Sequence, residues 1–145
     1  MMRVLSVLAV LAVGATAAFA QSAAIGQRKE ILKSWGGAMK DPGAMAKGEA
    51  AFDLAKVQAS LKTIAEGAPK LAGLFPDDSK TGGETKALPV IWEKKAEFLA
   101  IFTKIEADAK AAAVAIKDEA SFKAEWPKIG ANCGTCHKTF REQPK

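Results

Sequence analysis

The segment NCGTCHKTFR, residues 132–141, lies close to the C-terminus of this 145-residue chain and contains both cysteines and the only histidine of the sequence. Cys133, Cys136 and His137 form the pattern C-x-x-C-H, which is the attachment sequence of c-type haem. The two thiols would add across the vinyl groups of the porphyrin, and the imidazole of His137 would be the proximal ligand of the iron. The pattern therefore predicts one haem c per chain, held covalently by Cys133 and Cys136.

Other uses of this cysteine pair fit less well. A disulfide between residues only three apart would close a very small loop and stabilise little. A dithiol redox centre is expected in a βαβ setting, and the sequence shows little strand-like alternation. A zinc site would need further Cys or His ligands, and the chain has none left. A chance match to the pattern is the remaining alternative.

The first twenty residues have the features of a secretory signal peptide. A short start with Arg3 precedes an almost wholly apolar run over residues 4–19, and Ala18-Phe19-Ala20 offers a small-x-small cleavage site. The run is too short and too rich in Ala and Gly for a typical membrane span, so no stable membrane insertion is expected; an N-terminal anchor is the alternative. The sequence thus predicts a cleaved leader over residues 1–20, export to the periplasm, and a single domain over residues 21–145.

The chain has a net charge of +5, but its lysines are scattered between acidic residues. This pattern is typical of an ordinary solvated surface and argues against nucleic-acid binding by an exported protein. A weakly basic face could still steer an acidic redox partner.

Four segments after the leader carry apolar residues at helical spacing. The first covers residues 23–39 and should end at Asp41-Pro42-Gly43. The second should begin after Asp53, which is suited to the N-cap position. Residues 73–88, rich in Gly, Pro and Asp, are expected to form the longest loop.

Pro89 is suited to the first turn of a third helix, which should end between residues 109 and 116. A polar link over residues 117–119 leads to the fourth helix, which carries the C-x-x-C-H pattern. Pro127 should lie in or near the first turns of that helix, because a deeper proline costs a hydrogen bond. Four amphipathic helices around one core predict an all-α fold, an antiparallel four-helix bundle with covalently bound haem.

Several local features resemble the class II c-type cytochromes, the cytochrome c′ family. They are Arg28 four residues before Leu32, KGEAAFD at residues 47–53, VIW at 90–92 and CGTCHKTFR at 133–141. The resemblance covers essentially the whole chain after the leader. It implies a homodimer, usually formed through the first two helices, and small redox proteins as partners.

The resemblance also implies roles for two arginines. Arg28 would contact a haem propionate, and Arg141 would lie beside the proximal imidazole. Because Arg141 stands four residues after His137, both are expected on one helix face. The alternative for Arg141 is a simple charge complement to the dipole at the helix end.

The residue opposite the iron decides what such a haem does. Low-spin members of the class carry Met on the first helix, and high-spin members carry an apolar residue; the matching position here is Leu32, which cannot bind iron. Met39 and Met45 are the alternative ligands. Met39 lies about 10 Å further along the helix than Leu32, and Met45 lies beyond the predicted helix end.

An iron with an open sixth position behind Leu32 favours nitric oxide and carbon monoxide. No donor at that face would stabilise bound dioxygen or activate peroxide, so we do not expect an enzyme. The predicted function is electron transfer, binding of NO and CO, or both, and the alternative is a low-spin, Met-ligated electron carrier. Trp92 and Phe98 are expected to line the haem pocket, although a plain core role explains them equally well.

Overall fold

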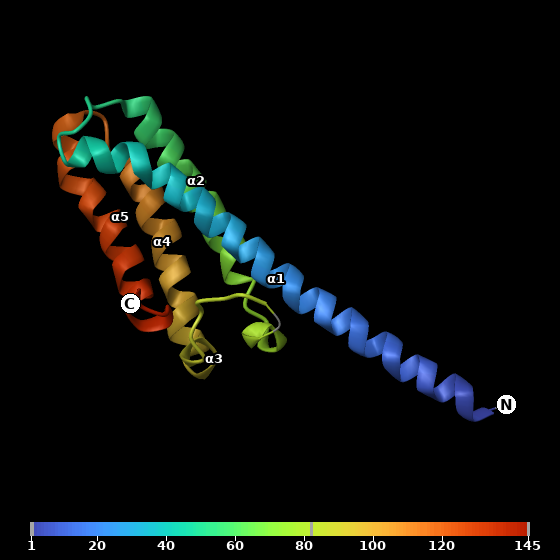
Figure 1. Cartoon of the computed structure of the whole chain (residues 1–145). Helices are drawn as coiled ribbons and strands as arrows, with labels where there is room; N and C mark the ends of the chain where they lie inside the picture. Colours follow the sequence, from blue (N-terminus) through green and yellow to red (C-terminus); the bar gives the residue numbers. More distant parts are fainter. Residues whose placement is uncertain (1, 82, 145) are drawn as a thin grey trace.

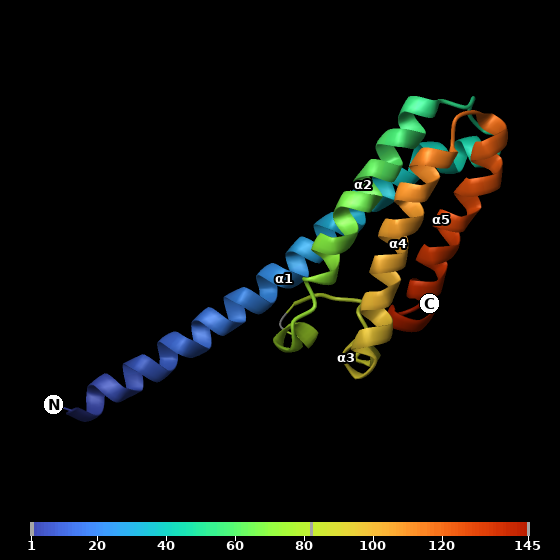
Figure 2. The same cartoon turned by 180° about the vertical axis from the view of Figure 1, so that it is seen from behind.

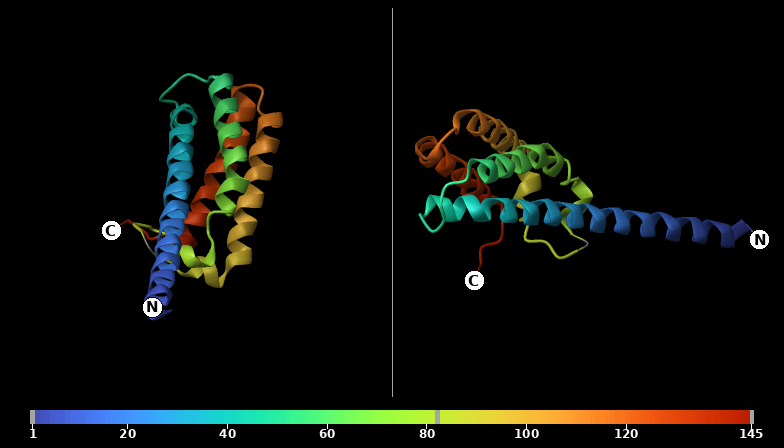
Figure 3. Two further views of the ribbon diagram at one scale, coloured as in Figure 1. Left: turned by 90° about the vertical axis from the view of Figure 1, so that its right-hand side faces the viewer. Right: turned by 90° about the horizontal axis from the view of Figure 1, so that it is seen from above.

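The computed structural model describes residues 2–81 and 83–144, with side chains from residue 23 onward. In this part of the chain the elements are α1 (Met2–Ala46), α2 (Leu54–Ala72), the 3-10 turn η1 (Asp77–Lys80), α3 (Val90–Glu93), α4 (Lys95–Ala115) and α5 (Glu119–Phe140). The long helices α1, α2, α4 and α5 lie side by side, and the first half of α1 projects beyond the others (Figures 1 and 2). The predicted four-helix bundle is confirmed, and its four long helices are seen most clearly along α1 (Figure 3).

Helix α1 differs from its predicted bounds at both ends. It begins at Met2, because the Ala-rich leader continues the helix without a break. It also continues through Asp41-Pro42-Gly43, where we expected it to end. Pro42 lacks the N–H that would bond the carbonyl of Ala38, but the Ser60 hydroxyl of α2 donates to this carbonyl at 2.7 Å. The proline is therefore tolerated because a neighbouring helix replaces the lost hydrogen bond.

The actual end of α1 is a glycine cap. Gly48 has a φ of +75°, and its N–H donates to the Met45 carbonyl at 3.0 Å. The N–H of Glu49 donates to the Ala44 carbonyl at 2.9 Å. This pair of bonds is the Schellman motif, in which glycine accepts the left-handed conformation without strain.

The middle of the chain follows the prediction with two differences. Asp53 caps α2 and accepts a hydrogen bond from the Lys56 N–H at 3.1 Å, as expected. The loop over residues 73–88 contains the short turn η1, which we did not predict. The third helix is divided in two, because Lys94 has non-helical backbone angles (φ −115°, ψ 42°); Pro89 lies directly before its first part, α3.

Helix α5 begins with a reciprocal cap between Asp118 and Ser121, in which the Ser121 N–H donates to the Asp118 carboxylate at 2.8 Å. Because this cap fixes the start at Glu119, Pro127 lies in the third turn of α5, close to the first turns where we expected it. The helix ends at Phe140. Arg141 is extended and forms an isolated antiparallel bridge with Ala87, so the expectation that Arg141 continues the helix face of His137 was wrong.

The core lies mainly between α2, α4 and their neighbours, whereas α1 and α5 contact each other at few positions. An aromatic cluster fills one end of the core, with ring centroids 4.6 Å apart for Phe75 and Phe98, 4.9 Å for Phe98 and Phe102, and 5.1 Å for Phe98 and Phe140. Among the described residues, no helix combines the length and the apolarity needed to span a membrane.

Candidate haem-binding site

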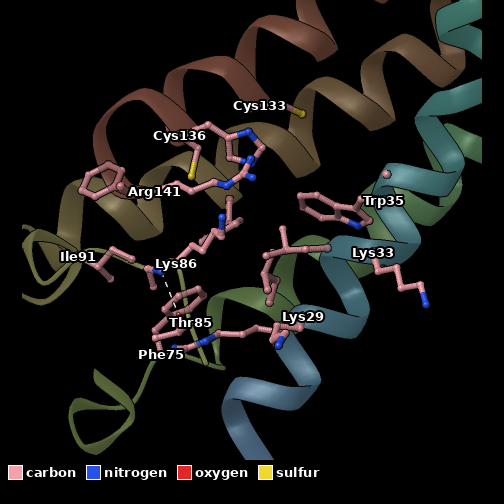
Figure 4. Close-up of a pocket in the computed structure, with 18 of the residues that line it drawn as sticks. Lys29, Lys33, Trp35, Phe75, Thr85, Lys86, Ile91, Cys133, Cys136 and Arg141 are labelled. Carbon is pink, nitrogen blue, oxygen red and sulfur yellow. Dashed lines mark hydrogen bonds between the residues drawn. The ribbon is translucent and has the colours of Figure 1, made fainter. Parts of the chain in front are cut away.

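A cavity with a volume of about 1150 Å³ opens between α1 and α5 (Figure 4). One wall is formed by Arg28, Leu32, Trp35 and Met39 of α1, and the opposite wall carries the C-x-x-C-H residues of α5. The aromatic cluster forms the floor, and residues 84–87 border the opening. The weak contact between α1 and α5 thus reflects a cavity large enough for a bulky flat group.

Cys133, Cys136 and His137 all line this cavity from the last turns of α5. Both thiols are free and half-buried, and the sulfur of Cys136 is directed into the cavity (Figure 4). Burial raises the pKa of the Cys133 thiol and raises the pKa of Cys136 to about 11. Reactive dithiols have a lowered pKa at a helix N-terminus, so the opposite shift near a helix C-terminus does not fit a dithiol redox centre.

The pKa of His137 is lowered by burial and by the positive charge of Arg141. Both effects favour the neutral imidazole, which is the form that binds metal ions. The guanidinium of Arg141 therefore acts on the imidazole although the two residues do not share a helix face.

The C-terminal segment ties the end of α5 to the loop that borders the cavity. The Leu88 N–H donates to the Phe140 carbonyl at 3.0 Å, and the Glu142 N–H donates to the Lys86 carbonyl at 2.8 Å. Gln143 donates from its side chain to the His137 carbonyl at 2.7 Å. These bonds place Arg141 on the cavity wall.

Arg28 is only 2% exposed and also lines the cavity. It donates to the Ser79 carbonyl at 2.9 Å, the Ser79 hydroxyl at 3.2 Å and the Leu74 carbonyl at 3.4 Å, and it lies 4.7 Å from the ring centroid of Phe75. Burial lowers its pKa. It forms no ion pair with a described carboxylate, and three bonds leave part of its five-donor fork free. A buried cation without an anionic partner is costly, so an acidic group in the cavity would stabilise it.

Leu32 is 41% exposed, although it faces the cavity and not the outer surface. Trp35 follows it by one turn and is 7% exposed. An exposed leucine between buried neighbours is the surface that an apolar group in the cavity would cover. The free thiols, the unpaired Arg28 and the exposed Leu32 therefore fit a porphyrin with two carboxylates.

The structure separates the two aromatic residues that we expected in the pocket. Phe98 lines the cavity. Trp92 does not; its indole N–H donates to the Pro76 carbonyl at 3.0 Å, and its ring packs near Phe75. Met39 lines the cavity, whereas Met45 is buried in the core away from it. Sequence reasoning missed Trp35, although its spacing of three residues from Leu32 indicated the same helix face.

A four-helix bundle with a C-x-x-C-H pattern on its last helix, facing a large apolar cavity, defines a c-type cytochrome of the bundle class. Comparison with known proteins leads to the same class. The family model described as Cytochrome C′ matches residues 23–141.

The chain is 51% identical over 140 residues to the cytochrome c′ of Rhodopseudomonas palustris, an alignment that covers 97% of this chain and 96% of that protein. It is 36% identical over 143 residues to the cytochrome c-556 of Agrobacterium fabrum, with 97% of each chain covered. A solved structure of cytochrome c′ from Rhodopseudomonas palustris superposes with a TM-score of 0.82 at 54% identity, covering 84% of this chain and 98% of that one. The chain belongs to the cytochrome c′ family of electron-carrying proteins and binds haem c.

Proposed function

We propose that this protein is a periplasmic haem c protein with high-spin, five-coordinate iron, which transfers electrons and binds NO and CO. The observation that carries the proposal is Leu32, an apolar residue exposed on the cavity wall opposite the C-x-x-C-H helix. Leucine offers no lone pair to the iron. The proposal excludes Met45 as a ligand because its side chain is buried in the core.

The residues of this chain have separate tasks in the proposal. Cys133 and Cys136 hold the haem through thioether bonds, and His137 is the proximal ligand. Arg28 pairs with a propionate, since it is a buried cation without an anionic partner, and Arg141 lies beside His137. When bound, the haem supplies a one-electron iron couple and one axial position for a small diatomic ligand.

Leu32 and Trp35 keep the distal side apolar, and this sets the ligand class. Small neutral diatomic molecules lose little hydration free energy when they enter such a space, whereas a charged ligand must give up a strongly bound hydration shell. The Leu32 side chain itself offers no hydrogen bond to dioxygen, so the proposal does not include oxygen activation.

The proposal also includes export, removal of residues 1–20 and a homodimer formed through α1 and α2. The leader composition supports export, and family membership supports the dimer. N-terminal sequencing of the secreted protein should begin at Gln21, and sedimentation should give twice the mass of one chain. A retained leader would contradict the first point, and a monomer at micromolar concentration would contradict the second.

The gas-binding part is tested by titrating the ferrous protein with CO and NO and following the Soret band. We expect both gases to shift the band, and cyanide to leave the ferric protein nearly unchanged at the same concentration. A protein that binds neither gas would contradict the proposal, and a Met39→Leu variant that gains CO binding would identify Met39 as the sixth ligand.

A further inference from the structure

Trp35 packs against the backbone of α2 at Gly67. A Cβ atom at Gly67 would lie 2.4 Å from Nε1 and 3.1 Å from Cε2 of Trp35, and 3.3 Å from Cγ2 of Ile31. The first distance is shorter than real side-chain contacts allow. The indole therefore occupies the space in which any other residue at position 67 would carry its side chain.

Gly67 differs in this respect from the other described glycines. Gly36, Gly130 and Gly134 have no atom within 4 Å of a built Cβ, and at Gly73 only the Lys70 carbonyl is near, at 3.6 Å. Glycine inside a helix is unfavourable, so a glycine in the middle of α2 indicates a packing requirement. Close approach of an aromatic ring is such a requirement.

The position of the Trp35 ring is not held by its polar atom. Its indole N–H is buried and finds no acceptor among the described residues. The ring lines the cavity one turn after Leu32 (Figure 4), and its Nε1 edge lies against α2 at Gly67. Steric room at Gly67 is thus what allows the indole to withdraw from the cavity toward α2.

We propose that Gly67 is a positioning residue for the distal pocket: it sets how deeply the Trp35 indole withdraws, and so how much space remains beside Leu32 for a ligand. The inference rests on the proposed function, because this space matters only if the iron binds a gas. A methyl group at position 67 would displace the indole toward the cavity and reduce the space.

The test uses Gly67→Ala and Trp35→Phe in the haem-containing full-length protein, with Gly73→Ala, at the C-cap of α2, as the control. We expect Gly67→Ala to slow CO association about tenfold and Trp35→Phe to accelerate it by a similar factor, because one methyl-sized change in an apolar pocket has effects of this order. Gly73→Ala should leave the rate unchanged. The double variant should bind CO no more slowly than Trp35→Phe alone.

A thermal unfolding cycle on the same variants separates this inference from the proposed function. Gly67→Ala should lower Tm by about 5 °C, and Trp35→Phe should remove most of that loss. Additive effects on Tm would overturn the inference whether or not CO binds. A CO association rate for Gly67→Ala equal to that of Gly73→Ala would also overturn it, whereas absence of CO binding in the wild type would contradict the proposed function.

Discussion

The two helix pairs of this bundle differ in what lies between them. Helices α2 and α4 meet directly, and α2 buries Leu61, Ile64 and Leu71 almost completely. Helices α1 and α5 contact each other little, and between them lies the cavity of about 1150 Å³ with Leu32 exposed on its wall. Apolar residues at helical spacing occur on both pairs, so periodicity alone does not distinguish a packed face from a ligand face.

The fold combines a large cavity with a packed core. The side chains of the packed side reach the cavity floor, because Phe98 and Phe102 belong both to the aromatic cluster and to the lining. Helix α5 is held by α4 and by the C-terminal bridge to Ala87, not by α1. The open side therefore has a rigid floor and one wall fixed independently of the other.

Removing both thiols should have the largest effect on the open side. The double variant Cys133→Ala/Cys136→Ala should lose all covalent haem, because no other described residue has a thiol that could form a thioether bond with the haem. Haem staining after denaturing electrophoresis, together with intact mass, measures this. Thr135→Ala is the control, since Thr135 is exposed and bonds only the Ala131 carbonyl in its own helix; covalent haem surviving in the double variant would contradict the assignment.

The same substitution on the two sides should separate packing from ligand contact. Leu61→Ala on the packed side should cost about 2–5 kcal/mol of the free energy of unfolding, because Leu61 is fully buried. Leu32→Ala should lower the free energy of unfolding by no more than about half the loss caused by Leu61→Ala. It should also accelerate CO binding. Denaturant unfolding of the ferric protein gives both values, and equal costs would show that Leu32 is an ordinary core residue.

Arg28 connects the open side to the loop over residues 74–79. Arg28→Met should lower the free energy of unfolding by about 1.5–3 kcal/mol, because the buried carbonyl of Ser79 and the partly buried carbonyl of Leu74 lose a charged donor. The loop should also become more sensitive to proteolysis. Lys29→Met, an exposed neighbour on the same helix, is the control, and similar behaviour of the two variants would contradict a structural role of Arg28.

The smallest effect is expected where α4 meets α5 at the surface. Hydrogen bonds from Lys104, 2.6 Å away, and from Asn132, 2.7 Å away, hold the pKa of Asp108 below its usual value. A lowered folded-state pKa adds stability above the unfolded pKa of about 3.9, which is lost as pH falls through the folded pKa.

Asp108→Asn should therefore destabilise by less than about 1 kcal/mol at pH 7, and the difference should shrink below about pH 4. Unfolding curves between pH 7 and pH 3 measure this. Asp78→Asn is the control, because Asp78 is outside the ion pairs of the described chain. If the difference in the free energy of unfolding between Asp108→Asn and wild type stays constant over this pH range, the carboxylate charge of Asp108 does not contribute to stability.

Local signals explain why much of the fold could be predicted from the sequence. The cap at Asp53 and the C-x-x-C-H residues act over a few neighbouring positions, and the structure places the cap at the start of α2 and the pattern on the last helix, as expected. The errors arose where a distant residue decides the local structure. Ser60 keeps α1 helical past Pro42, and Ala87 draws Arg141 out of the helix.

The site shows the same division. The α5 residues could be predicted because their chemistry is contained in five consecutive positions. The opposite wall is built from single residues whose sequence neighbours are ordinary, so periodicity could not tell that Phe98 faces the cavity whereas Trp92 turns to Pro76. Trp35 could have been found from its spacing to Leu32, but its contact with Gly67 is purely tertiary.

The spin state of the resting ferric protein tests the central claim most directly, because it reports whether any residue of the α1 wall binds the iron. Optical and electron paramagnetic resonance spectra of the purified protein, without added ligand, suffice. An empty sixth position behind Leu32 predicts high-spin spectra. A low-spin spectrum with the far-red sulfur-to-iron band would contradict the account and indicate a methionine ligand on the distal side.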